Sequence, residues 1–334
     1  MVNVREACAF AAKRLEASGA TTPAQLASII PTVGCPLTFL SSRLYLVSFL
    51  SSATSQLMVR HFLRHYLHTV GVPPRHVHVV VQRSRTPVSY AFAEFMRASV
   101  PLTQIRMDAD SYKEARRMHR VNEIVNSLPN ASYVIHADID ELFVYPCWLQ
   151  EQLARRGDEI FCAEMQDRLS QSGRITPLAD TPSIHAQYPK TCYLRQHILK
   201  TAAVSKIVLM KVSQKSGARR WFLDSHHVTG YRLSGMRCRA LGYFDHFTLT
   251  AEQLALTRRK LAKGSPFKAV QRKRVLYEQV QEFMDKFAAP HGDATQHKWC
   301  RGPPRRAVQN VTILQQTHLD YCGLRRLVGD RKAK

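Results

Sequence analysis

Three carboxylates follow directly after an apolar run in segment 136–143, which reads HADIDELF. Residues 133–137 have the character of a strand, and Asp138, Asp140 and Glu141 come next. Because residues two apart in a strand point to the same side, Asp138 and Asp140 project together if the strand extends that far. Two close carboxylates repel each other unless a cation lies between them, and oxygen ligands suit Mg²⁺ or Mn²⁺. The spacing predicts a divalent-metal site; the alternative is that Asp140 or Glu141 caps the next turn.

Other side chains could join such a metal site, although each also has an ordinary structural role. Asp108 and Asp110 form a second D-x-D pair between an expected strand and a helix, where capping is the favoured interpretation and a nucleotide-facing role the alternative. A neutral imidazole from His226, His227 or His246 could complete a carboxylate metal site. The chain holds 15 histidines, so a structural role is the ordinary expectation for any one of them.

Several familiar motifs are absent from the sequence. There is no G-x-x-x-x-G-K-[ST] phosphate loop, no G-x-G-x-x-G, no G-x-S-x-G and no H-E-x-x-H. ATP hydrolysis, dinucleotide redox chemistry, α/β-hydrolase activity and zincin activity therefore lose their main support.

The elements that must position these residues alternate along the first part of the chain. Apolar runs predict strands at 44–50, 76–81, 102–107 and 133–137, and amphipathic segments predict helices at 56–70, 88–98 and 111–128. This order predicts an α/β fold: a Rossmann-like, mostly parallel sheet with helices on both faces. Open sheets of this kind bind ligands at the carboxyl ends of their strands, which is where the acidic motif lies. Further strands are expected at 159–164, 205–212 and from 221, and a basic helical region at 251–287.

Composition and charge bound the remaining possibilities. The chain has 334 residues, is 45% apolar and carries a net charge of +23. Residues 200–334 hold 27 basic and 9 acidic side chains, so +18 of that charge lies there and suggests a polyanionic partner. No run reaches the roughly 20 apolar residues of a membrane span. The eight cysteines are scattered without zinc spacing, and pairing among them stays open.

The ordered motifs resemble the GT-A-fold glycosyltransferases of the family-2-like group. That group carries an Arg-x-Asn on a helix, then an apolar strand, then D-x-D-E, matched here by Arg120, Asn122, Asp138, Asp140 and Glu141. Segments 167–178, 205–212, 224–230 and 242–250 also look like later parts of that group, so the resemblance covers roughly 40–290. Together with the sequence pattern, it leads us to expect an N-terminal helical extension over 1–40 and a GT-A-like domain over 41–250. A basic helical region over 251–334 is expected to pack on the same domain.

The resemblance also implies a chemistry: transfer of a sugar from a nucleoside-diphosphate sugar to a hydroxyl acceptor, with Mn²⁺ or Mg²⁺ as cofactor. Asp138 and Asp140 would hold the metal, and His246 could add a ligand. Arg120 and Asn122 would line the donor, Lys206 could steady a phosphate, and Asp167 could contact or deprotonate the acceptor. The sequence departs from the group after the second strand, where Gln82-Arg-Ser-Arg85 stands in place of an acidic nucleoside contact. Either Asp108 or Asp110 takes that role, or the donor differs, or donor binding is impaired.

Two other function classes stay open at this stage. One is a degenerate transferase-like module that binds a polyanion through the basic half, although nucleic acid is disfavoured because the basic region lacks interleaved aromatics. The other is a metal-dependent phosphoesterase that uses the same carboxylates with water as acceptor. If an N-terminal anchor is missing from the chain, we expect a Golgi or secretory lumen; otherwise we expect the cytoplasm.

Overall fold

The computed structural model describes a set of ranges separated by gaps. They are 36–37, 40–51, 54–82, 92, 94–97, 105–108, 114–145, 149, 153, 160–194, 197, 205–213, 222, 239–262, 271–288 and 300. The chain forms two compact units, one made of 1–164, 205–244 and 309–334 and the other of 165–204 and 245–308. The expected regions 1–40, 41–250 and 251–334 stay predictions.

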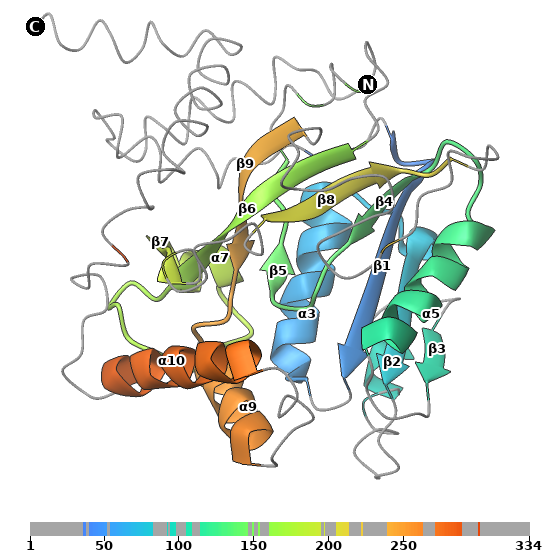
Figure 1. Cartoon of the computed structure of the whole chain (residues 1–334). Helices are drawn as coiled ribbons and strands as arrows, with labels where there is room; N and C mark the ends of the chain where they lie inside the picture. Colours follow the sequence, from blue (N-terminus) through green and yellow to red (C-terminus); the bar gives the residue numbers. More distant parts are fainter. Residues whose placement is uncertain are drawn as a thin grey trace, which may run out of the picture. The chain divides into compact units, whose positions relative to one another are not determined.

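A sheet with helices packed against it forms the first unit (Figure 1). Its strands are β1 (Leu44–Ser51), β2 (Val77–Gln82), β3 (Ile105–Asp108), β4 (Tyr133–His136), β5 (Glu141–Leu142), β8 (Ser205–Lys211) and the first parts of β6 (Ile160–Leu169) and β9 (Arg239–His246). Its helices are α3 (Gln56–Arg64), the π-helical η3 (His65–Val70), the short η4 (Pro74–His76) and α5 (Glu114–Ser127). The strand order is β3-β2-β1-β4-β8-β6-β9-β5.

Parallel pairing organises the half of the sheet that carries the acidic motif. β1 lies between β2 and β4 and runs parallel to both, with Val47 opposite His136 and Ser51 opposite Gln82. β2 pairs in parallel with β3. β8 then pairs antiparallel with β4 and with β6. The expected α/β class with a mostly parallel sheet is confirmed, with antiparallel strands added on one side.

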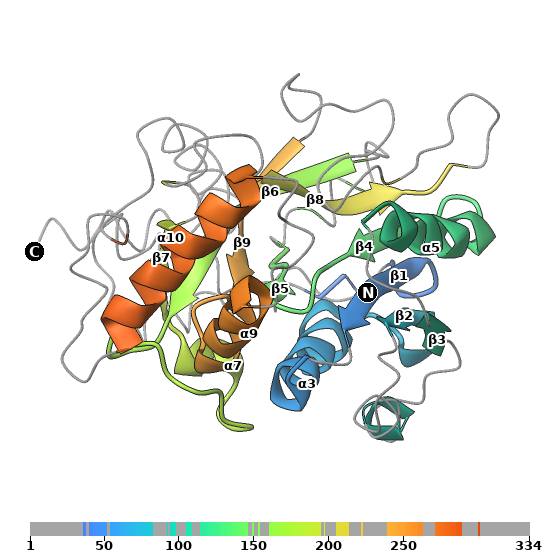
Figure 2. The same ribbon diagram turned by 60° about the horizontal axis from the view of Figure 1, so that its bottom comes forward.

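The two faces of β1 are covered by different helices. Tyr45 and Val47 of β1 belong to the same core cluster as Met118, Val121 and other α5 residues. Apolar residues three or four apart on α5 form one stripe, so this helix buries a single face. Figure 2 shows α3 on the other side of β1 from α5.

The first expected helix is confirmed with one change of geometry. Residues 56–70 are helical, but the last six form a π-helix that ends at Gly71, whose φ is 84°. Glycine accepts this left-handed conformation without the steric penalty of a Cβ. The π-helical turn carries His65 and Tyr66, two side chains that reach the acidic motif.

The second unit begins within β6. It contains the end of β6, α7 (Ile184–Gln187), β7 (Lys190–Cys192), α9 (Ala251–Ala262) and α10 (Gln271–Ala288). The expected basic helical region at 251–287 is thus two helices, and Arg258 of α9 pairs with Asp285 of α10. Cys192 forms a disulfide with Cys300 beside an apolar cluster that includes Phe283 and Met284. Among the described helices, none is long and apolar enough to cross a membrane.

Candidate functional site

The acidic motif begins where β4 ends, at the carboxyl edge of the parallel strands. All four residues of β4 are buried, Ala137 is buried after them, and the side chain of Asp138 is 26% exposed. The Ser48 hydroxyl of β1 donates to the carbonyl oxygen of Ala137 at 2.8 Å. This bond fixes the exit of the chain from β4, so Asp138 stands at the edge where α/β sheets bind ligands.

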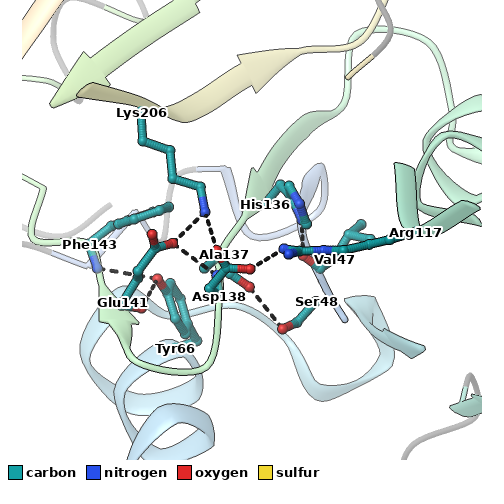
Figure 3. Close-up of polar contacts among 10 residues, drawn as sticks. All are labelled: Val47, Ser48, Tyr66, Arg117, His136, Ala137, Asp138, Glu141, Phe143 and Lys206. Atoms are coloured by element: carbon teal, nitrogen blue, oxygen red, sulfur yellow. Dashed lines mark hydrogen bonds and ion pairs between the residues drawn. The ribbon is translucent and has the colours of Figure 1, made fainter. Parts of the chain in front are cut away.

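Reciprocal hydrogen bonds close the turn between Asp138 and Glu141 (Figure 3). The backbone N–H of Glu141 donates to the carbonyl oxygen of Asp138 at 3.0 Å, and the N–H of Asp138 donates to the Glu141 carboxylate at 3.0 Å. The Tyr66 hydroxyl donates to the Glu141 carbonyl oxygen at 3.0 Å and accepts from the N–H of Phe143 at 3.2 Å. Glu141 is buried. Its side chain therefore shapes the turn, which agrees with the capping alternative for that residue.

Two cations surround the carboxylates of this turn (Figure 3). The ammonium of Lys206, on β8, lies 3.1 Å from Oδ2 of Asp138 and also pairs with Oε2 of Glu141. The guanidinium of Arg117, on α5, pairs with Oδ1 of Asp138. Lys206 is fully buried and Arg117 nearly so. Lys206, which was predicted to contact a phosphate, therefore pairs with carboxylates of the protein.

The charges in this cluster hold one another ionised. Burial alone would raise the pKa of Asp138, but Arg117 and Lys206 hold that pKa well below its usual range. Burial alone would lower the pKa of Lys206, but the carboxylates of Asp138 and Glu141 raise it above its usual value. Asp138 is therefore a carboxylate whose charge is fixed by its neighbours while its side chain remains partly exposed.

His136, the last residue of β4, is kept neutral beside this cluster. Its Nδ1 lies 3.0 Å from the carbonyl oxygen of Val47, which can only accept, so Nδ1 carries the proton. Nε2 is buried and has no hydrogen-bond partner among the residues that the structure describes. Burial, with the positive charges of Lys206 and Arg117, lowers the pKa of His136 to about 3.

The predicted donor residues on α5 have partners within the protein. Asn122 donates to the carbonyl oxygen of Phe222 and accepts from its N–H, each at 2.8 Å, so its amide clamps a distant backbone segment. Arg120 pairs with Glu123 at 2.9 Å and lies 3.9 Å from Asp108. Asp108, at the end of β3, is buried and accepts from Arg116 at 3.4 Å. Arg120 and Asp108 are brought together, whereas Asn122 is engaged elsewhere.

Asp140 lies half-buried in the acidic turn itself, and the remaining predicted residues lie in the second unit or outside the described ranges. There, the buried Asp167 and His246 form a pair with Nδ1 and Oδ1 2.8 Å apart. On the alternate face of the same strands, Asp245 accepts from Arg168 at 2.5 Å and pairs with His185 at 2.9 Å. Asp110, His226 and His227 lie outside the described residues.

The arrangement at Asp138 does not fit a divalent metal ion. Both of its oxygens already contact side-chain cations, and one of those cations also holds Glu141. Within the described ranges, no three His, Cys, Asp or Glu side chains are grouped so that they could hold a metal. The ligand set Asp138, Asp140 and His246 stays a prediction that this grouping does not support.

Sequence reasoning did not assign Arg117 or Tyr66 to the site. Arg117 lies among other arginines of α5, and such a run of charges on a helix ordinarily indicates a solvated face. Only the position of β4 shows that Arg117 is buried against Asp138. Tyr66 lies near the end of an amphipathic helix, where a core role is the ordinary expectation for an aromatic residue. Asn122, which the resemblance did single out, carried a second signal, because asparagine is unfavourable in a helix interior unless its amide has partners.

No family model matches the sequence, and no curated protein sequence matches it. Solved structures with some likeness include the mannosyltransferase PcManGT from Pyrobaculum calidifontis in complex with GDP-Man and Mn²⁺, at 13% identity over 97% of this chain and 99% of that one, with a TM-score of 0.33. A protein from Desulfovibrio desulfuricans named as a nucleotide-diphospho-sugar transferase is 12% identical over 73% of this chain and 98% of its own, with a TM-score of 0.32.

A third similar structure is 4-diphosphocytidyl-2C-methyl-D-erythritol synthase. The two are 16% identical, with a TM-score of 0.25. The matched part is 38% of this chain and 63% of the length of that protein. These neighbours include nucleotide-diphospho-sugar transferases. At such identities and TM-scores the likeness does not identify a family for this chain.

Proposed function

We propose that the chain is a glycosyltransferase that moves a sugar from a nucleoside-diphosphate sugar to a hydroxyl acceptor. The observation that carries the proposal is the Asp138 carboxylate, ionised and partly exposed at the carboxyl ends of β1 and β4. A carboxylate fixed in this way can accept hydrogen bonds from the hydroxyls of a ribose or a sugar. Such hydroxyls are the groups that a nucleotide sugar offers, and the D-x-D-E motif supports the same assignment.

Basic side chains near that edge of the sheet are suited to bind the diphosphate of the donor. Arg116 and Arg120 are both partly exposed on α5, and they flank Asp108 at the end of β3. Guanidinium groups match phosphate oxygens in a bidentate geometry. We therefore assign Arg120 and Arg116 to the diphosphate and Asp138 to hydroxyls. Arg117 holds Asp138, and Asp167 stays a proposal for the acceptor side.

The resemblance implies Mn²⁺ or Mg²⁺, which would act as a Lewis acid on the leaving diphosphate. Because both Asp138 oxygens contact Lys206 and Arg117, this carboxylate does not fit such an ion, and its proposed contact with the donor requires none. The acceptor is a glycan or another hydroxyl compound, and the basic half of the chain favours an acidic one.

Thermal melting with a panel of nucleoside diphosphates and their sugars tests the donor site, once with Mn²⁺ and once with EDTA. A ligand at a hundred times its dissociation constant adds about 2.7 kcal/mol of stability. We expect one nucleotide class to raise the melting temperature, the Asp138→Asn variant to lose that shift, and Glu282→Gln, an exposed change on α10, to keep it. If no nucleotide shifts the wild type with either Mn²⁺ or EDTA, the proposal fails.

A second candidate is a polyanion-binding module, and the +18 charge of residues 200–334 favours it. Such a module would bind an acidic polymer with an affinity that falls steeply as the salt concentration rises. Neither added nucleotide nor the Asp138→Asn change would alter that affinity. Release of phosphate or sugar phosphate from the donor without any acceptor would instead indicate a phosphoesterase.

A further inference from the structure

One ammonium group holds two carboxylates of the acidic turn. Lys206 contacts Oδ2 of Asp138 at 3.1 Å and Oε2 of Glu141, and its side chain is fully buried. Glu141 is itself buried and accepts from the N–H of Asp138. The ammonium of Lys206 therefore lies between the carboxylates of Asp138 and Glu141, as Figure 3 shows.

A bridging position between two carboxylates is the position that a divalent cation takes in oxygen-ligand sites. Here the second oxygen of Asp138 contacts Arg117, so the two carboxylates face two side-chain cations. Both oxygens of Asp138 are paired, so a metal cation that approached this carboxylate would also approach the positive charges of Lys206 and Arg117. Like charges at such distances repel strongly where burial excludes water.

We propose that Lys206 is the resident cation of this turn and takes the place of a divalent metal at Asp138. Lys206 does not contact the donor in this role, because it is fully buried. It is a positioning residue that fixes Asp138 and Glu141 at the sheet edge. The inference deepens the proposed function, on which it rests, because it makes the Asp138 contact with the donor independent of metal.

Lys206 and its neighbour Lys211 offer a matched pair of variants. Both lie on β8, but Lys211 lies opposite Tyr133 at the start of β4, whereas Lys206 contacts the carboxylates that follow the end of β4. Lys206→Met removes the ammonium and leaves a chain of similar length. Lys211→Met makes the same chemical change away from the acidic turn.

Mn²⁺ alone, without any nucleotide, is titrated by calorimetry into the wild type, Asp138→Asn, Lys206→Met and Lys211→Met. Any Mn²⁺ binding that the wild type shows should persist unchanged in Asp138→Asn. We expect Lys206→Met to bind Mn²⁺ at least about tenfold more tightly than the wild type, which is about 1.4 kcal/mol, and Lys211→Met to show no gain. Saturable binding to the wild type that Asp138→Asn abolishes overturns the inference, as does a folded Lys206→Met variant without the gain.

If Lys206→Met does not fold, the comparison of the wild type with Asp138→Asn still decides the matter. The combined variant Lys206→Met with Glu141→Gln is the companion, because it restores the charge balance of the turn. It should fold and, with Asp138 paired to Arg117 alone, show no gain in Mn²⁺ affinity. A tenfold gain in this variant contradicts the role given to the shared ammonium.

The titration is independent of the donor experiment. Failure of every nucleotide to shift the melting temperature overturns the proposed function and leaves the Mn²⁺ result standing. A nucleotide shift that disappears in EDTA and depends on Asp138 overturns the resident-cation inference while it supports the transferase.

Discussion

His136 is the residue whose protonation should be visible in the stability of the whole protein. Its pKa in the folded state is about 3, against about 6.5 in an unfolded chain. The unfolded chain therefore takes up this proton first as the pH falls. The contribution of His136 is fully present above pH 6.5 and is lost progressively as the pH falls toward 3.

We expect the free energy of unfolding to fall by about 2 to 3 kcal/mol between pH 6.5 and 4.5 because of this one group. His136→Asn keeps a donor that can reach Val47 but has no proton to gain, so this part of the slope should disappear. Urea unfolding at several pH values measures it. His119→Asn, an exposed histidine on α5, should retain the wild-type slope; equal slopes in all three proteins would contradict the assignment.

Tyr66 is the second residue with a separable contribution. Its buried hydroxyl serves both the carbonyl oxygen of Glu141 and the N–H of Phe143. Tyr66→Phe leaves those two backbone groups without this partner, at a cost of about 1 to 3 kcal/mol. Urea unfolding at neutral pH gives the value, and Tyr66→Phe should also weaken the nucleotide-induced shift because the turn loosens. A change below about 0.5 kcal/mol would show that the hydroxyl does not fix the turn.

Among the elements, α5 does more than cover the sheet. It carries Arg117 to Asp138, and it holds the backbone of Phe222 through Asn122. We expect Asn122→Ala to cost about 2 kcal/mol or more, because two buried backbone groups lose their partner. The neighbouring change Glu123→Ala removes a partly exposed ion pair and should stay within about 0.5 kcal/mol. Chemical denaturation of both variants measures the difference, and similar values would argue against the clamp.

Strands with one clear physical signal were predictable from the sequence. β1, β2 and β4 are buried on both faces, which favours runs of valine, leucine and aromatic residues. β9 was not expected, because Arg239–His246 has neither an apolar run nor a regular alternation. The end of β6 was also missed: Gln166, Asp167 and Arg168 are polar, but each is buried with a partner on another element.

The site was predictable to the same degree. The position of Asp138 follows from the strand before it, and the resemblance singles out Lys206, although as a phosphate contact and not as a partner of Asp138. Their contact could not be predicted, because it depends on β8 pairing antiparallel with β4. The same holds for Arg117, whose burial is set by the sheet and not by its own helix.

At the scale of the molecule, a covalent bridge supports the second unit. The Cys192–Cys300 disulfide closes a sequence separation of 108 residues. Loss of such a bridge costs about 2 to 4 kcal/mol. We expect a reductant to lower the melting temperature, and the double variant Cys192→Ala with Cys300→Ala to reproduce most of that loss. Cys162 is also disulfide-bonded, so the variant should retain some response to reductant. An unchanged melting temperature in reductant would contradict a structural role.

The parallel pairing of β1 with β4 also has a consequence for how the protein is made. The bond from Ser48 to Ala137 spans 89 residues of sequence. At about 5 to 20 residues per second, a ribosome needs on the order of 5 to 20 seconds to deliver the partner strand after β1 has been synthesised. Through that interval one edge of an apolar strand is open to pairing with other chains. The nascent chain should thus depend on chaperones until β4 arrives, and the acidic turn forms only after that step.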